Sequence, residues 1–260
     1  MISFDVVRLA LKEYGSRPPF DYCVIDGLFE HEVADKLSAE FPDYGSAEWF
    51  YYKNPLEDKK ALNDWNAFPP LTYQAFSLLQ ARETVALFEA AVGKRLYADQ
   101  GLHGGGWHIH ESGGNLNPHL DYSIHPKLGL QRKLNIIVYL SKELQPEHGG
   151  HLGFWAHDSQ TNEPGELVTE IEPRFNRAVL FDTTQNSWHG MSKPFTPPGG
   201  IYRKSFAVYY LCDPAPDAAA RGRALYAPRP MQRGDPEIER IIRLRSGIDT
   251  SQEVYRTEKS

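Results

Sequence analysis

Residues 133–140 read Lys-Leu-Asn-Ile-Ile-Val-Tyr-Leu, and residues 203–211 read Arg-Lys-Ser-Phe-Ala-Val-Tyr-Tyr-Leu. Both stretches are rich in β-branched and aromatic residues, which favours β-strands. Because side chains alternate between the two faces of a strand, each stretch has one face that mixes polar and apolar groups. This face carries Asn135, Ile137 and Tyr139 in the first stretch and Arg203, Ser205, Ala207 and Tyr209 in the second. We therefore expect polar side chains to point inward from two core strands.

The two stretches belong to a longer region of short β-type runs, which begins at Gly101 and is interrupted by Gly, Pro and Asn turns. Strands are predicted at 107–110, 116–121, 133–140, 151–155, 167–171, 178–181, 187–189 and 203–211. Short strands at this spacing are typical of antiparallel sandwiches and jelly rolls. The predicted fold class is mainly β with helical additions (α+β), with a double-stranded β-helix, or jelly roll, as the core.

Helical segments are expected on both sides of this core. Before it, apolar spacing predicts helices from Phe4, from Val33, and at 71–80 and 83–92, with a strand at 22–26. After it, a helix is predicted at 236–245. The expected organisation is one structural domain in three parts: an N-terminal helical or mixed layer over 1–100, a catalytic core over 101–212 and a C-terminal extension over 213–260.

Two segments leave alternatives open. The aromatic segment 43–70 is too long for a plain connector, so it forms a lid or a substrate wall, or its aromatic rings pack against the core. The helix at 236–245 has Ile238, Ile241 and Ile242 on one face. This face covers the barrel or pairs with its own copy in a homodimer.

The composition excludes several classes of function. The chain has 28 Lys and Arg against 34 Asp and Glu, a net charge of −6, and no basic run, so nucleic acid is not an expected partner. No stretch of about 18 apolar residues occurs, so neither a membrane span nor a signal peptide is expected. Cys23 and Cys212 form no paired motif, which is typical of a reducing compartment. A cytoplasmic protein is therefore expected.

A candidate metal centre comes from the tripeptide His119-Leu120-Asp121. Alternation along a strand places its imidazole and carboxylate on one face. Alone this pattern has little weight, because ten His and 34 acidic residues give about one such match by chance. A further histidine, His189, lies on another predicted strand at the far end of the sandwich. Two imidazoles and one carboxylate suit a non-haem Fe(II) site with open positions, although zinc accepts the same ligand types.

An inward arginine on a core strand needs an anionic partner. The guanidinium of Arg203 can hold a carboxylate through two parallel hydrogen bonds, and the Ser205 hydroxyl can add a third. The other strand brings a phenol from Tyr139 and an amide from Asn135 to the same side. Together these side chains predict a pocket for a small dicarboxylate.

These motifs resemble those of a known family. They are H-x-D at 119–121, R-x-x-N-x-x-x-Y-L at 132–140, G-G-H-L-G-F-W at 149–155, F-D-x-x-x-x-S-W-H-G at 181–190 and R-K-S at 203–205. In order and spacing they are similar to the prolyl-4-hydroxylase-like branch of the 2-oxoglutarate/Fe(II) oxygenases. The similarity extends over 101–211 and is far more specific than the H-x-D tripeptide.

The resemblance implies a role for each matching residue. It assigns the catalytic iron to His119, Asp121 and His189, with 2-oxoglutarate and O2 as cosubstrates. It implies that Arg203 anchors the distal carboxylate of 2-oxoglutarate. Tyr139, Ser205 and Asn135 are implied as further cosubstrate contacts. A carboxylate at 121 favours hydroxylation over halogenation, because halogenating relatives have a small residue there.

Contacts to the substrate are less specified. The family leads us to expect an inward tyrosine before the triad, and this sequence has Ile109 there instead. The candidate substrate residues are His108, His110, Tyr122 and Trp188. The expected reaction is hydroxylation of an unactivated C–H bond in a small organic substrate, an amino acid or a natural-product intermediate, with succinate and CO2 as coproducts. Desaturation and ring formation use the same triad.

Other functions explain fewer residues. A prolyl-type hydroxylase of peptides or proteins is the alternative within the family. A cupin-like metal-dependent hydrolase or isomerase would leave Arg203, Ser205 and Tyr139 without a role. A non-catalytic jelly-roll binding module would leave the His-Asp-His triad without one.

Overall fold

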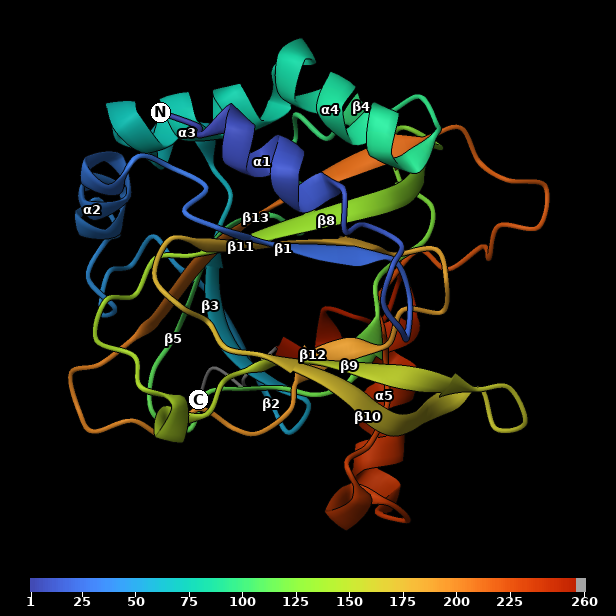
Figure 1. Cartoon of the computed structure of the whole chain (residues 1–260). Helices are drawn as coiled ribbons and strands as arrows, with labels where there is room; N and C mark the ends of the chain where they lie inside the picture. The colour runs from blue at the N-terminus through green and yellow to red at the C-terminus, as the bar shows by residue number, and fades with distance from the viewer. Residues whose placement is uncertain (256–260) are drawn as a thin grey trace.

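The computed structural model describes residues 1–255 and contains two antiparallel sheets that face each other (Figure 1). The major sheet has the order β1 (Tyr22–Asp26), β11 (Arg177–Asp182), β8 (Gln131–Tyr139), β13 (Arg203–Cys212), β5 (Gly106–His110), β3 (Glu57–Leu62) and β2 (Phe50–Asn54), with β4 (Tyr97–Ala98) beside β13 and β6 (Asn115–Leu116) beside β3. The minor sheet has the order β10 (Glu163–Ile171), β9 (Leu152–Asp158), β12 (His189–Met191), β7 (His119–Leu120) and β14 (Leu225–Tyr226). The predicted fold class, a mainly β jelly-roll core with added helices, is confirmed.

Helices cover the outer face of the major sheet (Figure 1). They are α1 (Phe4–Leu11), α2 (His31–Ala39), α3 (Pro70–Gln80) and α4 (Arg82–Val92). Their apolar faces share one core with alternate residues of β8 and β13, among them Ile136, Val138, Phe206 and Val208. Because this core takes one set of alternating side chains, the other set faces the minor sheet. No helix in the described part of the chain is long and apolar enough to cross a membrane.

The segment 43–70 is more regular than the sequence indicates. It contains the β2–β3 hairpin, which extends the major sheet, and a short helix η1 (Trp65–Ala67). Both expectations for its aromatic residues are met in part. Trp49 is buried against Trp107 in the core, whereas Phe50 and Tyr52 line the central cavity.

Two predicted strands are shorter or displaced. The strand expected at 116–121 is divided into β6 and β7, because Pro118 has no N–H with which to continue a ladder. The strand expected at 187–189 instead begins at His189 and runs to Met191. Each of the other predicted core strands lies within or overlaps a strand of the structure.

The C-terminal extension packs against the core. Its helix α5 (Pro236–Ser246) buries Ile238 and Ile241 in a cluster with Tyr226 of β14 and Leu56 of the hairpin. The apolar face of α5 therefore covers this end of the protein. Pairing with a second copy stays a prediction. Short helices complete the fold: η2 (Pro146–His148), η3 (Pro230–Gln232) and η4 (Glu253–Tyr255).

Candidate active site

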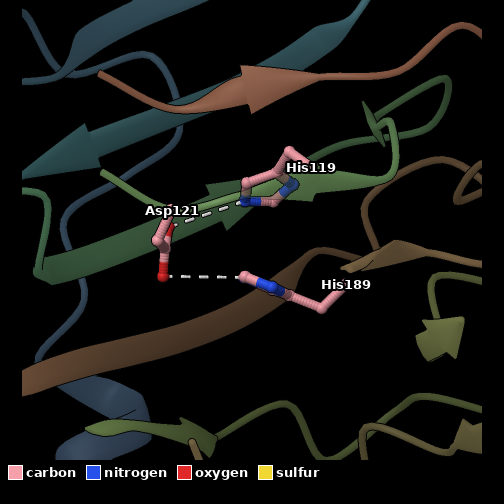
Figure 2. Close-up of side chains that lie close together, drawn as sticks. All are labelled: His119, Asp121 and His189. Carbon is pink, nitrogen blue, oxygen red and sulfur yellow. Dashed lines mark ion pairs between the residues drawn. The ribbon is translucent and has the colours of Figure 1, made fainter. Parts of the chain in front are cut away.

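The minor sheet brings together the three residues of the predicted triad (Figure 2). His119 and His189 are direct partners between β7 and β12, and Asp121 follows β7. The Nε2 atom of His119 lies 3.8 Å from Asp121 Oδ1, and that of His189 lies 3.7 Å from Oδ2. All three side chains are buried, and their ligand atoms lie within 4.8 Å of one another. The arrangement offers two nitrogens and one carboxylate oxygen to a single ion.

Backbone carbonyls orient both imidazoles. His119 Nδ1 lies 3.0 Å from Asn117 O, and His189 Nδ1 lies 2.8 Å from Ser187 O. A carbonyl only accepts, so each Nδ1 carries the proton and each Nε2 keeps a free lone pair. Gly190 allows this close approach of strands, because a Cβ there would lie 2.6 Å from Asn117 O. Both histidines therefore offer Nε2 as the atom that could hold a metal ion.

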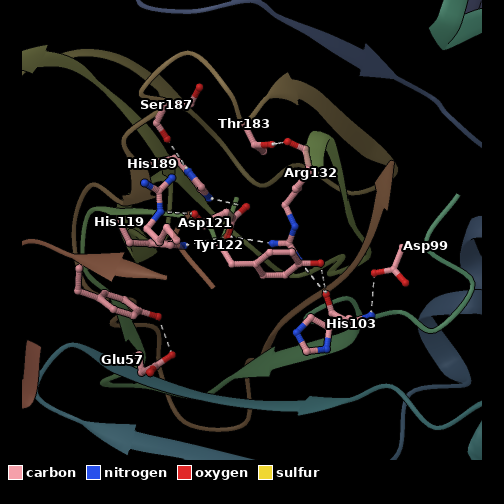
Figure 3. Close-up of polar contacts among 12 residues, drawn as sticks. Glu57, Asp99, His103, His119, Asp121, Tyr122, Arg132, Thr183, Ser187 and His189 are labelled. Atoms are coloured by element: carbon pink, nitrogen blue, oxygen red, sulfur yellow. Dashed lines mark hydrogen bonds and ion pairs between the residues drawn. The ribbon is translucent and has the colours of Figure 1, made fainter. Parts of the chain in front are cut away.

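An arginine accompanies the carboxylate (Figure 3). Arg132 Nη1 lies 3.3 Å from Asp121 Oδ1, while Nη2 donates to His103 O at 2.7 Å. The guanidinium lies between the rings of Tyr122 and Tyr209, 3.4 and 3.3 Å from their centroids. Burial opposes ionisation of Asp121, but Arg132 and the two imidazoles outweigh it and hold the pKa of this carboxyl at about 2. Asp121 is thus a carboxylate at neutral pH.

The two histidines are neutral because burial disfavours the charged form of an imidazole. Burial lowers the pKa of His119 to about 3, and the neighbouring His189 contributes in the same direction. Burial likewise lowers the pKa of His189. Neutral imidazoles beside an ionised carboxylate are the protonation states that metal binding requires.

The major sheet supplies the facing wall through two rows of cross-strand neighbours. One row runs through Phe50, Ala61, His108, Ser205 and Tyr139, which are paired in succession across β2, β3, β5, β13 and β8. The second row runs through Tyr52, Lys59, His110 and Arg203; Lys59 continues the β3–β5 register one residue beyond the Lys60–Ile109 pair. Side chains in such rows are neighbours on one face of the sheet.

Arg203 is a buried cation on this wall. Its side chain is 6% exposed, its Nε donates to Gly150 O at 2.8 Å, and its guanidinium lies 4.8 Å from the centre of the Tyr139 ring. Within residues 1–255 no carboxylate pairs with it, and neither the Tyr139 hydroxyl nor Asn135 Oδ1 has a hydrogen-bond partner. Buried groups of this kind are normally satisfied, so the wall is built to receive a polar anion.

A cavity of about 340 Å³ separates the triad from this wall. The hairpin and the C-terminal extension line its sides. Its lining includes His119, Asp121 and His189; His108, His110, Asn135, Arg203 and Ser205; Phe50, Tyr52 and Lys59; and Arg223, Tyr226 and Arg245. Tyr139 is fully buried directly behind Arg203.

The candidate substrate residues have different positions. His108, His110 and Tyr122 line the cavity, and Tyr122 also supports Arg132. Trp188 does not line it: the indole is 1% exposed, packs with Leu120 and Trp155, and donates to His157. The expectation that Trp188 contacts substrate is therefore corrected. It precedes His189 in the strand direction, so alternation sends its side chain to the opposite face.

Ile109 is also placed differently from expectation. It is 1% exposed and belongs to the core beneath the helices, on the face opposite His108 and His110. The inward positions of β5 are thus the two histidines. Position 109, where the family led us to expect an inward tyrosine, therefore faces the core beneath the helices and not the cavity.

The comparisons with known proteins agree with this geometry. The sequence profile of the 2OG-Fe(II) oxygenase superfamily matches residues 105–211, the part of the chain that supplies the triad and Arg203. This core belongs to the 2OG-Fe(II) oxygenase superfamily. The protein is a 2-oxoglutarate-dependent oxygenase. A search of curated protein sequences gave no match to this oxygenase.

Solved structures share its fold. A prolyl-4-hydroxylase from Pseudomonas putida is 13% identical, with a TM-score of 0.57 over 80% of this chain and 100% of the other. HygX from Streptomyces hygroscopicus, solved with nickel, 2-oxoglutarate and hygromycin B, is 15% identical, with a TM-score of 0.51 over 81% and 88%. A Trichoplax adhaerens prolyl hydroxylase, in complex with a peptide fragment of the hypoxia inducible factor oxygen degradation domain, is 14% identical, with a TM-score of 0.51 over 80% and 88%.

The oxygenase uses Fe(II), with 2-oxoglutarate and O2 as cosubstrates, and its cavity fits them. Among residues 1–255, the triad is the one group of three or more His, Cys, Asp or Glu side chains that could hold a metal ion. Its donor set leaves positions open, as an iron that binds a chelating cosubstrate and O2 requires. The unpaired Arg203 across the cavity fits a carboxylate.

Sequence reasoning missed three features of the oxygenase site. Arg132 was part of a quoted motif, but simple alternation places it on the apolar face with Leu134. A bulge at Lys133, where Tyr210 pairs with Leu134 and Leu211 pairs with Arg132, turns it inward. Lys59 of the hairpin and Tyr226 of the extension were also missed. Lys59 stands in a charged run and Tyr226 in a two-residue strand, so neither residue can be recognised as part of a site before the fold is known.

Proposed function

We propose that His119, Asp121 and His189 bind Fe(II) in this oxygenase, which then hydroxylates an unactivated C–H bond of a small organic substrate such as an amino acid or a natural-product intermediate. Succinate and CO2 are the coproducts. One observation carries the proposal: three buried ligand atoms within 4.8 Å of one another face an unpaired buried Arg203 across a cavity.

The residues around the iron have separate tasks in this proposal. Arg203 holds the distal carboxylate of 2-oxoglutarate, because a guanidinium fork matches a carboxylate and no protein carboxylate among the described residues occupies it. Tyr139 and Ser205, adjacent to Arg203 on the sheet, donate to the same carboxylate, and Asn135 offers its amide nearby. The bound iron supplies the oxygen activation that side chains cannot provide.

The size and lining of the cavity support a small substrate. Its volume of about 340 Å³ lies at the lower end of the range for small-molecule sites. The β2–β3 hairpin and the C-terminal extension both contribute to its lining, which limits access of an extended polypeptide.

Anaerobic titration tests the metal and cosubstrate assignments together. Fe(II) and 2-oxoglutarate added to apoprotein are expected to give the weak visible charge-transfer band of bidentate chelation. Asp121→Ala removes a ligand and is expected to abolish the band, whereas Asp58→Ala on the hairpin, outside the cavity lining, keeps it. Absence of the band in the unmodified protein, or its persistence in Asp121→Ala, would overturn the proposed centre.

A second assay addresses the substrate class. Succinate release above the uncoupled rate is measured against a panel of free amino acids, other small organic compounds and short peptides. Turnover of small molecules is expected. Turnover of polypeptides alone would replace the proposal by the prolyl-type alternative.

A further inference from the structure

The cavity contains more positive charge than the iron and 2-oxoglutarate sites use. Its lining includes Lys59, Arg132, Arg203, Arg223 and Arg245. Arg132 pairs with Asp121, and Arg245 donates to Glu57 at 2.7 Å. Arg203 is proposed to bind 2-oxoglutarate. Two cations remain: Arg223, and Lys59, whose nearest carboxylate, Glu57 at 3.9 Å, is shared with Arg245.

Lys59 is enclosed but poorly compensated. Its side chain is 16% exposed and its Nζ lies 5.2 Å from the centre of the Tyr52 ring. The acidic group near it is Glu57, at 3.9 Å, but this carboxylate already accepts hydrogen bonds from Arg245, Tyr226 and Tyr255. Within the described part of the chain Nζ donates no hydrogen bond. A cation so enclosed requires an anionic partner, because solvent reaches little of it.

Arg223 is a second cation of the cavity lining. It lies just before β14, lines the cavity, and makes no hydrogen bond or ion pair through its guanidinium within residues 1–255. The two cations thus line one cavity from different elements, Lys59 from the hairpin and Arg223 from the C-terminal extension.

His110 separates this group from Arg203. It lies between Lys59 and Arg203 in the row across β3, β5 and β13, and both its ring nitrogens lack a partner among the described residues. Burial, with Arg203 and Lys59 as positive neighbours, lowers its pKa, so the ring is neutral and offers one donor and one acceptor. Because strands are about 4.8 Å apart, β3 and β13 are about 10 Å apart. This spacing suits two separate anions, one at Arg203 and one at Lys59.

We propose that the substrate is a small carboxylate whose carboxylate group is bound by Lys59 and Arg223, with His110 contacting its polar neighbour atoms. This inference rests on the proposed function and narrows its substrate class to anionic molecules, of which free amino acids and organic acids are examples. The ion pair fixes the substrate at the hairpin side of the cavity. The rest of the molecule then extends towards His119, Asp121 and His189.

A matched panel tests the requirement for a carboxylate. The proteinogenic L-amino acids, a set of simple organic acids and the primary amides of all of them are titrated into the protein loaded with Fe(II) and 2-oxoglutarate without oxygen. Binding is read from the change in the charge-transfer band, and turnover from succinate release after oxygen is added. Carboxylates are expected to bind and their amides are not. Equal binding of acids and amides, or no binding of any carboxylate, overturns the inference.

Single substitutions test the two residues. Lys59→Gln and Arg223→Gln are each expected to weaken binding of the best carboxylate at least about tenfold, while the affinity for 2-oxoglutarate is unchanged. Lys59→Arg keeps the charge and is expected to recover part of the loss. Lys12→Gln, an exposed site on the far helical layer, serves as the control. If Lys59→Gln weakens 2-oxoglutarate and leaves the substrate unaffected, Lys59 belongs to the cosubstrate site and the inference is wrong.

The same titration separates the two proposals. No charge-transfer band in the unmodified protein removes the proposed iron and 2-oxoglutarate sites, and the substrate inference with them. A normal band together with binding of neutral amides leaves the proposed function intact and overturns the carboxylate assignment alone.

Discussion

Tyr226 stacks on the imidazole of His119, with 5.0 Å between ring centroids and 25° between the ring planes. The two residues face each other in register between β14 and β7. The Tyr226 hydroxyl donates to the fully buried Glu57 at 2.7 Å, and Glu57 also accepts from Arg245 of α5. Through this chain of contacts the C-terminal extension and the hairpin both support one of the proposed iron ligands.

Two substitutions of Tyr226 distinguish the contribution of its hydroxyl group from that of its stacked ring. Tyr226→Phe keeps the stacked ring but leaves Glu57 short of a donor, so unfolding free energy is expected to fall by about 1–3 kcal/mol while metal affinity is retained. Tyr226→Ala also removes the stack and is expected to weaken metal binding. Urea denaturation and zinc titration measure the two effects. Tyr73→Phe, at a half-exposed ring, is the control; equal stabilities of Tyr226→Phe and the unmodified protein would contradict the prediction.

Arg132 is expected to position Asp121. Arg132→Gln removes the cation 3.3 Å from Oδ1 and the packing between Tyr122 and Tyr209. Metal affinity is expected to fall about 10- to 100-fold, the usual cost of losing a partner of a ligand. Zinc and Fe(II) titrations measure it. Arg132→Lys, which keeps charge but not the planar fork, is expected to recover only part of the affinity; full recovery would show that charge alone matters.

Replacement of Arg203 is expected to affect the binding of 2-oxoglutarate and not that of the metal. Arg203→Gln is expected to weaken 2-oxoglutarate binding by about 2–5 kcal/mol, because a buried charge partner is lost, with zinc affinity unchanged. Tyr139→Phe removes a single donor and is expected to cost only about 0.5–1.5 kcal/mol. Anaerobic calorimetry measures both. Unchanged 2-oxoglutarate affinity in Arg203→Gln would move the anchor to another residue.

The inward face of the two central strands could be predicted because alternation is strict wherever a ladder is regular. Asn135, Ile137, Arg203, Ser205 and Tyr209 all line the cavity as that pattern requires. Prediction failed where the ladder is irregular. The bulge beside Arg132 reverses the parity of the strand, and no local residue signals it.

The hairpin and the C-terminal contacts could not be predicted for a different reason. Residues 57–62 read Glu-Asp-Lys-Lys-Ala-Leu, a charged run without the alternation of a half-buried strand. They form β3 because Lys59 lines a polar cavity and the buried Glu57 accepts hydrogen bonds from Arg245 and Tyr226. A strand of this kind is recognisable only from its partners. The pairing of His119 with His189 likewise depends on tertiary structure, and the family resemblance supplied it.

The pH dependence of metal binding tests the electrostatics of the triad. A metal requires neutral imidazoles and an ionised carboxylate, so a lowered histidine pKa favours binding in acid. Two ordinary histidines of pKa about 6.5 would both be largely protonated at pH 5.5 and would lower metal affinity about 100-fold. Here the pKa of His119 is about 3, that of His189 is also lowered, and that of Asp121 is about 2.

Zinc affinity of the apoprotein is therefore expected to change little between pH 7.5 and pH 5.5 and to fall only as the pH approaches the lowered histidine values. Calorimetry at pH 6 in two buffers of different ionisation enthalpy counts the protons released on binding. A value near zero is expected, because burial has already removed the proton from each ligand nitrogen before the metal arrives. Release of about one proton per histidine would mean that water reaches the empty triad and that the imidazoles are charged there.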